Sequence, residues 1–317
     1  MTGALWAVAS GIGFGLFQSI NRRAIVGMDV FLSTFIQLLI STVVLAAVSL
    51  LTEDVGAVAR APLWALATFG LVGLIHFFVG WTLLNLSQKL IGAARAGPLL
   101  ATTPMFGALF AALALDEVPD VVTVIGMLVT VSGVYVLSRE RPAAEAAPDA
   151  PGAPAPVRGG VHTAVAVRTP TAARLGMLAG LGTALCWSVS PVFIRRGLEG
   201  LPSPLLGVTV SMIASVIAYG VVVVVRWPRL GVATTPRSSF GFKVAAALLV
   251  GLATWSRWIA LDHTTVAIVL AVNSVSVPTV LLLAPLIVGR HLEHATVRVW
   301  LGAGLVVTGS LVLILKG

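Results

Sequence analysis

The sequence predicts an all-α integral membrane protein, with ten transmembrane helices arranged as two inverted five-helix repeats. Three observations indicate this fold class: an apolar composition, continuous apolar runs, and motifs that recur in both halves. Hydrophobic residues make up 58% of the 317 residues and charged residues only 10%, whereas a soluble domain carries about 25% charged residues. A soluble fold of this length cannot hide so much apolar surface, so much of it must face lipid.

The apolar runs lack the alternation that is typical of membrane β-barrels, and they therefore indicate transmembrane helices. A helix needs about 20 mostly apolar residues to cross the hydrocarbon core. The first run has no basic segment before it and no small-residue cleavage site after it, so we expect a retained helix rather than a signal peptide. The ten expected spans are 4–21, 30–51, 62–84, 92–115, 120–138, 174–194, 203–225, 241–261, 266–289 and 296–315.

A Pro- and Ala-rich segment separates the fifth expected span from the sixth. Residues 139–160 have the sequence RERPAAEAAPDAPGAPAPVRGG, which carries charges of both signs and cannot bury a core. We therefore expect a mobile linker at 139–173, between a first repeat at 1–138 and a second repeat at 174–317. A docking motif formed by the spaced prolines is the less favoured alternative.

Motifs recur in the two halves in the same order. GMLVTVSG at 126–133 aligns with GAGLVVTG at 302–309, and SINRRAI at 19–25 aligns with VFIRRGL at 192–198. Because five is an odd number, the second half must enter the membrane in the opposite direction to the first. Inverted repeats of this kind are typical of alternating-access transporters, whose substrate site lies between the halves.

The recurring arginine pairs are therefore expected at opposite ends of the helix bundle. The positive-inside rule cannot explain both pairs, because at most one of them faces the cytoplasm. Two interpretations stay open for these arginines. Snorkelling of the side chains to lipid headgroups is preferred over a gating role, since arginine is common at the ends of membrane helices.

Both halves resemble the EamA-type family of the drug/metabolite transporter superfamily. The resemblance lies in GIGFGLFQSINRRA at 11–24, in GTALCWSVSPVFIRRG at 182–197, and in the order of Pro, Glu and paired Gly within 103–138. It implies ten helices, a central cavity between the halves, and transport of small metabolites. The second half departs from the pattern at one position, because His291 stands where the first half has Glu117.

The resemblance and the charge pattern give opposite orientations. Counting Lys and Arg in the connections places both termini outside the cell, whereas the resemblance implies cytoplasmic termini. We favour the resemblance, because several of the counted residues lie inside helices or at their ends. We expect a multi-pass protein of the cytoplasmic membrane, whose oligomeric state the sequence leaves open.

Polar and aromatic residues inside the expected spans are the candidate solute contacts, because polar groups in lipid need partners and a cavity offers them. Gln18 lies on a face of the first helix that is otherwise rich in small residues, and Trp187 lies on the equivalent face of the sixth. The expected solute-binding residues are Gln18, Asn21, His76, Trp81, Asn85, Trp187, Ser190, Trp255, Arg257, Asn273 and Ser276.

Two of these candidates are assigned specific roles. His76 is the only imidazole well inside an expected span, and it is the first candidate for proton coupling; a hydrogen-bonded core histidine is the alternative. Arg257 lies between Trp255 and Trp258 and would suit a carboxylate or phosphate group of the solute. Snorkelling of Arg257 from the helix end is its alternative.

Pro104 and Pro278 are expected to break two transmembrane helices at corresponding positions. Pro104 precedes Glu117 at the same spacing at which Pro278 precedes His291. A proline removes one backbone donor and frees a carbonyl, which in lipid needs a neighbour or a cavity. Interrupted helices at matched positions indicate a transporter site, and a kink without ligand contact is the alternative.

The placement of acidic residues limits the class of solute. All twelve lie in connections, in the linker or at helix ends, whereas a proton/cation exchanger that works through a buried acid needs a central carboxylate. We expect a secondary transporter of a small anionic, zwitterionic or neutral metabolite, working by alternating access. A lipid or lipid-carrier flippase of the same fold is the alternative, because Arg257 would also suit a phosphorylated headgroup.

Other classes of function are disfavoured. A membrane enzyme needs clustered carboxylates or histidines, and the one cluster, GRHLEH at 289–294, lacks the spacing of a zinc-protease motif. The single Cys186 excludes an internal disulfide and a cysteine-cluster metal site. The net charge of +8 is scattered along the chain and forms no block for nucleic acid. We expect no enzymatic activity, cofactor or metal, and only solute and lipid as partners.

Overall fold

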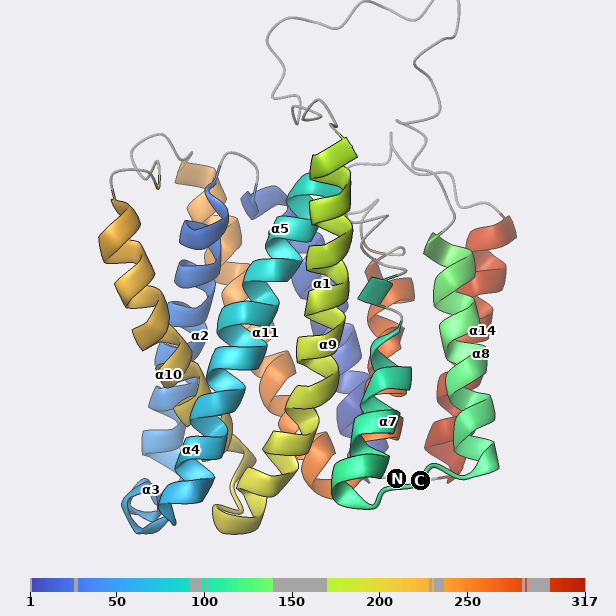
Figure 1. The fold of residues 1–317 in the computed structure, drawn as a ribbon, viewed down its shortest axis with the longest axis horizontal. Helices are drawn as coiled ribbons and strands as arrows, with labels where there is room; N and C mark the ends of the chain where they lie inside the picture. The colour runs from blue at the N-terminus through green and yellow to red at the C-terminus, as the bar shows by residue number, and fades with distance from the viewer. Residues whose placement is uncertain are drawn as a thin grey trace, which may run out of the picture.

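The structure of the protein is a computed structural model, and it describes most of both halves. The described residues are 2–25, 28–91, 99–100, 102–138, 170–227, 230, 237–280, 283 and 297–316. In this part of the chain all regular secondary structure is helical (Figure 1). The core of the expected linker, 139–169, lies outside these residues, as do parts of the expected fourth and ninth spans.

The helices follow the expected apolar runs closely. In the first half they are α1 (Thr2–Ile25), α2 (Val30–Thr52), α3 (Gly56–Arg60), α4 (Leu63–Val72), the π-helix η1 (Gly73–Gly80), α5 (Trp81–Ile91), α7 (Thr103–Leu115) and α8 (Val121–Ser138). In the second half they are α9 (Pro170–Gly200), α10 (Pro204–Arg226), α11 (Arg237–His263), α12 (Val266–Val272), the 3₁₀ helix η5 (Asn273–Val275) and α14 (Val297–Lys316).

Six helical segments of the described chain are long and apolar enough to cross a membrane. They are Thr2–Asn21, Val30–Thr52, Leu63–Ser87, Thr171–Gly200, Pro204–Arg226 and Arg237–His263. Shorter apolar helices occupy the other four expected spans, at Thr103–Leu115, Val121–Val136, Val266–Val280 and Trp300–Leu315. The chain is therefore a multi-pass membrane protein.

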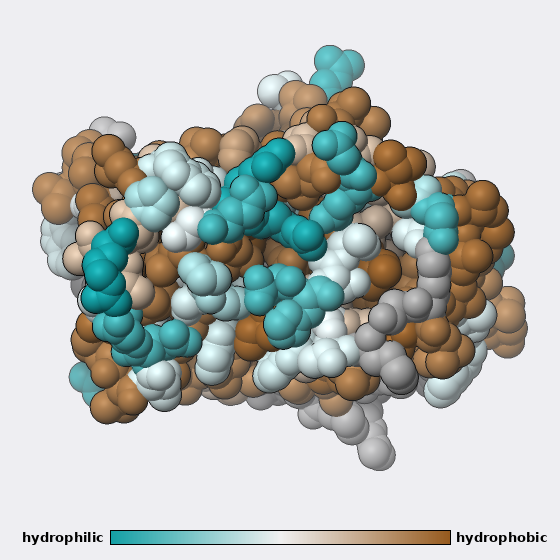
Figure 2. All heavy atoms as spheres, turned by 90° about the horizontal axis from the view of Figure 1, so that it is seen from below, coloured by the Kyte–Doolittle hydropathy of each residue, from teal (hydrophilic) through white to brown (hydrophobic). Residues whose placement is uncertain are grey.

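The outer surface carries large apolar side chains in the manner of a lipid-facing protein. Leu51, Leu113, Val224 and Leu315 are each at least 75% exposed, and they lie on four different helices. Figure 2 shows one end of the bundle, with hydrophobic side chains around the rim and hydrophilic side chains across the middle. This distribution fits a bundle whose sides contact lipid and whose ends contact water.

The second helix of each half begins with an N-cap at equivalent positions. The Asp29 carboxylate accepts hydrogen bonds from the backbone N–H groups of Phe31 and Leu32, at 2.8 and 3.3 Å. The Ser203 hydroxyl accepts one from Leu206 N–H at 3.1 Å, at the start of α10. Asp and Ser are favoured at this position because their oxygens pair with the free N–H groups of the first turn.

Equivalent helices of the two halves each pack on helices of the opposite half. α1 packs along α11, while α9, its counterpart in the second half, packs along α5 and η1. α2 packs on α10, and α8 packs on α14. In Figure 1 both termini lie at the lower end, α8 rises from that end and α14 descends to it. We call the lower end, with α3 and both termini, the terminus end, and the opposite one the linker end.

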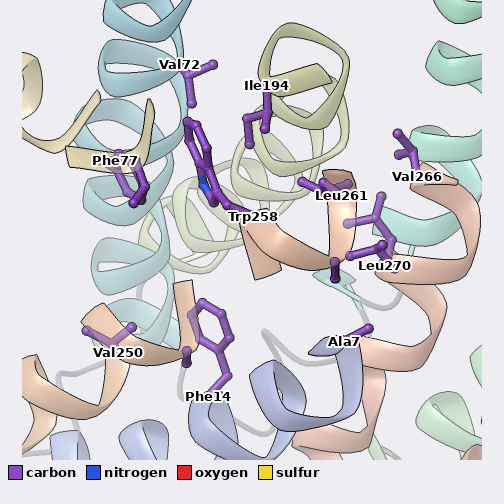
Figure 3. Close-up of a cluster of buried hydrophobic side chains, with 14 of the residues drawn as sticks. Ala7, Phe14, Val72, Phe77, Ile194, Val250, Trp258, Leu261, Val266 and Leu270 are labelled. Carbon is purple, nitrogen blue, oxygen red and sulfur yellow. The ribbon is translucent and has the colours of Figure 1, made fainter. Parts of the chain in front are cut away.

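The apolar core joins the two halves. Figure 3 shows Trp258 of α11 beside Phe77 of η1 and Ile194 of α9. Phe69 of α4 packs against the Trp258 ring, with centroids 5.5 Å apart. Phe14 of α1 lies in the same buried cluster. Since helices from both halves contribute, this core fixes the relative position of the side chains that the two halves present to each other.

Glycines allow α8 and α14 to approach closely. A Cβ atom added at Gly133 would lie 2.6 Å from the Val306 nitrogen and 2.7 Å from the Gly302 oxygen. A Cβ atom added at Gly309 would lie 2.7 Å from the Gly126 oxygen. Small residues at such a contact let helix backbones pack directly in lipid, where no hydrophobic driving force holds helices together.

Gly133→Val is therefore expected to destabilise the protein by about 1–3 kcal/mol, the usual effect of overpacking. The measurement is the melting temperature of the purified protein in detergent, which should fall. Gly304→Val on α14 is the matched control, because an added Cβ atom there has no neighbour within 4 Å. Equal shifts for the two variants would contradict the close contact.

Candidate solute site and an ion pair at the terminus end

A π-helical segment presents His76 to the second half. Gly73 at its start lets η1 approach α10, since a Cβ atom there would lie 2.2 Å from the Ser211 oxygen. The His76 ring is 3% exposed and stacks on Trp187 of α9, with centroids 5.6 Å apart and planes 17° apart. Arg257 of α11 is also 3% exposed, and its neighbour Trp258 lies beside Phe77 in the buried core (Figure 3). π-helical segments occur frequently at functional sites.

Buried polar atoms without hydrogen-bond partners gather in this region. Within the described chain they include His76 Nδ1, Trp187 Nε1, and both Nε and Nη2 of Arg257. Trp187 Nε1 lies against η1, since a Cβ atom added at Gly80 would be 2.9 Å from it. Indole and guanidinium groups only donate hydrogen bonds, and leaving them unpaired is costly. The region therefore suits a ligand rich in acceptors.

Trp81 extends this region with an aromatic surface. Its ring stacks on Phe17 of α1, with centroids 6.0 Å apart and planes 24° apart. Phe77 meets the Trp81 ring edge-on at 5.7 Å. The Trp81 Nε1 atom is buried and has no hydrogen-bond partner among the described residues. Its N–H is thus another donor available to a ligand.

Other expected contacts have partners within the protein. Asn85 Nδ2 donates to Thr34 Oγ1 at 2.6 Å, and Asn273 Oδ1 accepts from Ser10 Oγ at 2.9 Å. Ser190 donates to the backbone oxygen of Cys186, one turn earlier in α9. These bonds join helices or satisfy a hydroxyl locally, and they give the three residues structural roles in this conformation.

The remaining expected contacts differ in their surroundings. Ser276 is buried, and its backbone oxygen would lie 2.9 Å from a Cβ atom at Gly15 of α1. Gln18 of α1 and Trp255 of α11 are half-buried. The structure therefore brings His76, Trp187 and Arg257 together, whereas Asn85 and Ser190 are engaged elsewhere.

The two prolines occupy different settings. Pro104 lies in the first turn of α7, after Thr102, and residues 99–100 before this turn are also helical. The expected helix break at Pro104 stays a prediction. The first turn needs no N–H donor, which makes proline favourable at that position. Pro278 follows the 3₁₀ segment η5, in which the helix tightens at Asn273–Val275.

Lys243 was missed by the sequence analysis. Its ammonium group is fully buried and donates to Asn21 Oδ1 and Gln37 Oε1, each at 2.7 Å. Lys243 lies near the start of the expected span 241–261, where charged side chains usually reach water. The polar residue Gln37 lies inside the expected span 30–51 and could have indicated a buried partner for Lys243.

An ion pair joins the two halves at the terminus end. Arg195 Nη2 lies 3.1 Å from Glu117 Oε1, and these side chains are 31% and 12% exposed. Arg195 Nη1 also donates to the backbone oxygens of Leu261 and Thr264, at 3.1 and 2.8 Å. Glu117 Oε2 accepts from Val266 N–H at 3.0 Å, at the start of α12.

Snorkelling, the preferred expectation for the arginine pairs, is therefore wrong for Arg195. Its guanidinium is held by an acid of the first half and by two carbonyl oxygens at the end of α11. The neighbouring Arg196 is more exposed and donates to the Ala114 oxygen at 2.9 Å. The side chains of Arg22 and Arg23, the matching pair in the first half, lie outside the described part.

No group of three or more His, Cys, Asp or Glu side chains is placed to hold a metal ion in the described ranges. The GRHLEH segment at 289–294 lies outside those ranges.

Comparison with known proteins identifies the family. The model of the EamA-like transporter family matches residues 1–139 and 174–315. A solved crystal structure, described only as that of a protein, has a TM-score of 0.72 and 20% identity, with 99% of this chain and 98% of that chain covered. At this identity the likeness shows the fold alone. No curated protein matches the chain.

The family match extends over both halves of the chain and agrees with the apolar helices of the structure. It also agrees with the resemblance found in the sequence motifs. The chain therefore belongs to the EamA-like transporter family, a family of membrane transporters in the drug/metabolite transporter superfamily.

Proposed function

We propose that the protein is a secondary transporter with ten spans, which moves a small metabolite across the cytoplasmic membrane by alternating access. Its first repeat is 1–138, its second is 174–317, and 139–173 connects them. The solute is anionic, or is zwitterionic or neutral with acceptor groups. The observation that carries this proposal is the set of buried, unpaired donors around Arg257.

The charge of Arg257 is the main argument for an anionic group. The side chain is 3% exposed, and two of its three nitrogens have no hydrogen-bond partner among the described residues. A buried charge without a counterion costs several kcal/mol. A solute carboxylate or phosphate would supply the counterion and accept two parallel hydrogen bonds from the guanidinium.

The surrounding side chains suit recognition of a small solute. Trp187 and Trp81 offer aromatic faces and one N–H donor each. His76 adds an imidazole nitrogen, Nδ1, without a partner in the described chain. Because these groups come from η1, α5, α9 and α11, a relative movement of the repeats would change the site's geometry. This is what alternating access requires.

The ion pair between Glu117 and Arg195 supports a conformation closed at the terminus end. It links the α7–α8 connection to α9, and its backbone bonds reach α11 and α12. Opening that end would break these contacts together. In the second half the residue at the Glu117 position is His291, so the equivalent contact at the linker end lacks the acid.

The proposal is tested by uptake into proteoliposomes containing the purified protein. A panel of radiolabelled carboxylates, phosphorylated metabolites and amino acids is offered, with and without a pH gradient. Saturable uptake of at least one solute, absent from protein-free liposomes, is the expected result. Scrambling of a fluorescent phospholipid without uptake of any solute would instead indicate the flippase.

His76→Ala is expected to remove the stimulation of uptake by a pH gradient, if the gradient stimulates the wild type. The reason is that His76 is a titratable group in direct contact with the proposed site. The initial rate of uptake is measured at equal internal and external pH and with a gradient of one unit. Trp187→Phe is the control, since it changes the stacking partner and keeps the imidazole. Full stimulation in His76→Ala would exclude His76 as the proton carrier.

A further inference from the structure

A buried lysine lies where three helices meet towards the linker end. The Lys243 ammonium of α11 donates to Asn21 Oδ1 of α1 and to Gln37 Oε1 of α2, each at 2.7 Å. Solvent reaches none of Lys243, 5% of Asn21 and 1% of Gln37. These three residues are called the lysine cluster below.

Lys243 has two amide partners and no acidic partner in the described chain. An ammonium has three N–H groups, and the two amide oxygens use two of them. A buried ammonium that lacks a counterion costs several kcal/mol. Asp29, the acid at the start of α2, is engaged as a helix cap by Phe31 and Leu32.

The two amides of the lysine cluster hold Lys243 through their oxygens. Each amide turns its oxygen to the ammonium, so its NH₂ group is directed away from Lys243 Nζ. An amide NH₂ carries two donors and no acceptor. An ammonium with one N–H that the two amides leave unused has the chemistry that binds a carboxylate or phosphate.

Lys243 and Arg257 lie on the same side of α11. They are two heptads apart, which corresponds to roughly four turns and roughly 21 Å along the helix axis. Val250 lies midway between them and is fully buried in the core. Since α11 begins at the linker end (Figure 1), Lys243 lies nearer that end and Arg257 nearer the terminus end. A small solute therefore reaches only one of them at a time.

We infer that the lysine cluster is a second oxyanion subsite, which binds the carboxylate or phosphate of the solute between the Arg257 site and the linker end. The inference rests on the proposed function, because it assumes an anionic solute that passes along α11. The two cations then hold the same anionic group in turn. A purely structural lysine, which ties three helices together, is the alternative that the experiment must separate.

The experiment uses the full-length protein in detergent, with sodium acetate and sodium phosphate as probes. Melting temperatures are compared with those in sodium chloride of equal ionic strength. The Arg257→Gln background removes the first site. In this background each probe is expected to raise the melting temperature by about 2–5 °C, because a ligand that binds only the folded state stabilises it.

Three further changes, each made in the Arg257→Gln background, test the assignment. Lys243→Gln should abolish the response to both probes, and Lys243→Arg should keep it because the charge remains. Asn21→Asp should also abolish the response, since it places a carboxylate of nearly the same shape beside Lys243. This last variant keeps the lysine, so it tests the subsite even if Lys243→Gln does not fold.

Several outcomes would overturn the inference. One is a rise in melting temperature that persists after Lys243→Gln. Another is the absence of any rise in Arg257→Gln, in which Lys243 is present. A rise caused by added phosphatidylglycerol but not by the soluble anions would assign the lysine cluster to a lipid headgroup instead. Failure of the proposed function is seen separately, as unchanged solute uptake by Arg257→Gln in proteoliposomes.

Discussion

Arg257→Ala is expected to lower the kcat/KM of anionic solute uptake by about 100-fold or more. A charge-assisted hydrogen bond contributes about 1.5–3 kcal/mol, and the guanidinium has two buried nitrogens that lack partners in the described chain. Loss of roughly 3 kcal/mol corresponds to about a 100-fold loss of affinity. The initial rate of uptake is measured in proteoliposomes with equal amounts of folded protein.

Two variants show whether this effect belongs to the site. Arg257→Lys keeps the charge but loses the planar pair of donors, so it should recover only part of the activity. Arg237→Ala is the matched control, because Arg237 lies exposed in the first turn of the same helix. Unchanged uptake in Arg257→Ala would contradict a solute contact at Arg257 and favour the alternative of a snorkelling side chain.

Glu117→Gln is expected to open the terminus end more often. The ion pair with Arg195 is mostly buried, and removing one partner leaves the other charge unpaired, at a cost of about 1–2 kcal/mol. Such a change shifts a two-state equilibrium by about 5- to 30-fold. The measurement is the rate at which a thiol reagent labels Ala267→Cys in a Cys186→Ser background. Ala267 is 3% exposed and follows Val266, whose N–H donates to Glu117.

The same experiment has a control within the first half. Asp54 and Arg60 form an ion pair between side chains that are 70% and 66% exposed, at the same end of the bundle. Asp54→Asn should leave the labelling rate unchanged. An exposed ion pair contributes little to stability, and Asp54 and Arg60 both belong to the first repeat. Equal labelling of all three proteins would show that the Glu117 contact does not close that end.

The helices themselves were largely predictable from hydropathy. The helical bounds Val30–Thr52 and Pro204–Arg226 differ by a few residues at most from the expected spans 30–51 and 203–225. In lipid a protein needs an apolar exterior and a fully hydrogen-bonded backbone. An apolar run of helical length meets both requirements, and it can be recognised within a short stretch of sequence. Hydropathy does not show where one helix ends and another begins, and α7 starts at Thr103 inside the expected span 92–115.

The candidate site was only partly predictable. Composition drew attention to His76 and Arg257 as polar groups in apolar runs, but only the fold shows that η1 packs on α9 and α10 while Trp258, next to Arg257, lies in the same buried core. Lys243 and Glu117 were undervalued because each lies near a helix end, where charged side chains usually reach water. A partner far away in the chain cannot be recognised from a single position.

The sequence by itself determined that this protein is a helical membrane transporter with a duplicated architecture. Composition, continuous apolar runs and recurring motifs are read from the sequence and need no knowledge of the fold. Only the tertiary structure decided which buried charges have partners. Arg195 meets Glu117, Lys243 meets Asn21 and Gln37, and Arg257 keeps two nitrogens unpaired among the described residues. The physical reason is that desolvation makes each charge depend on its neighbours in space, which helix packing sets and local sequence does not.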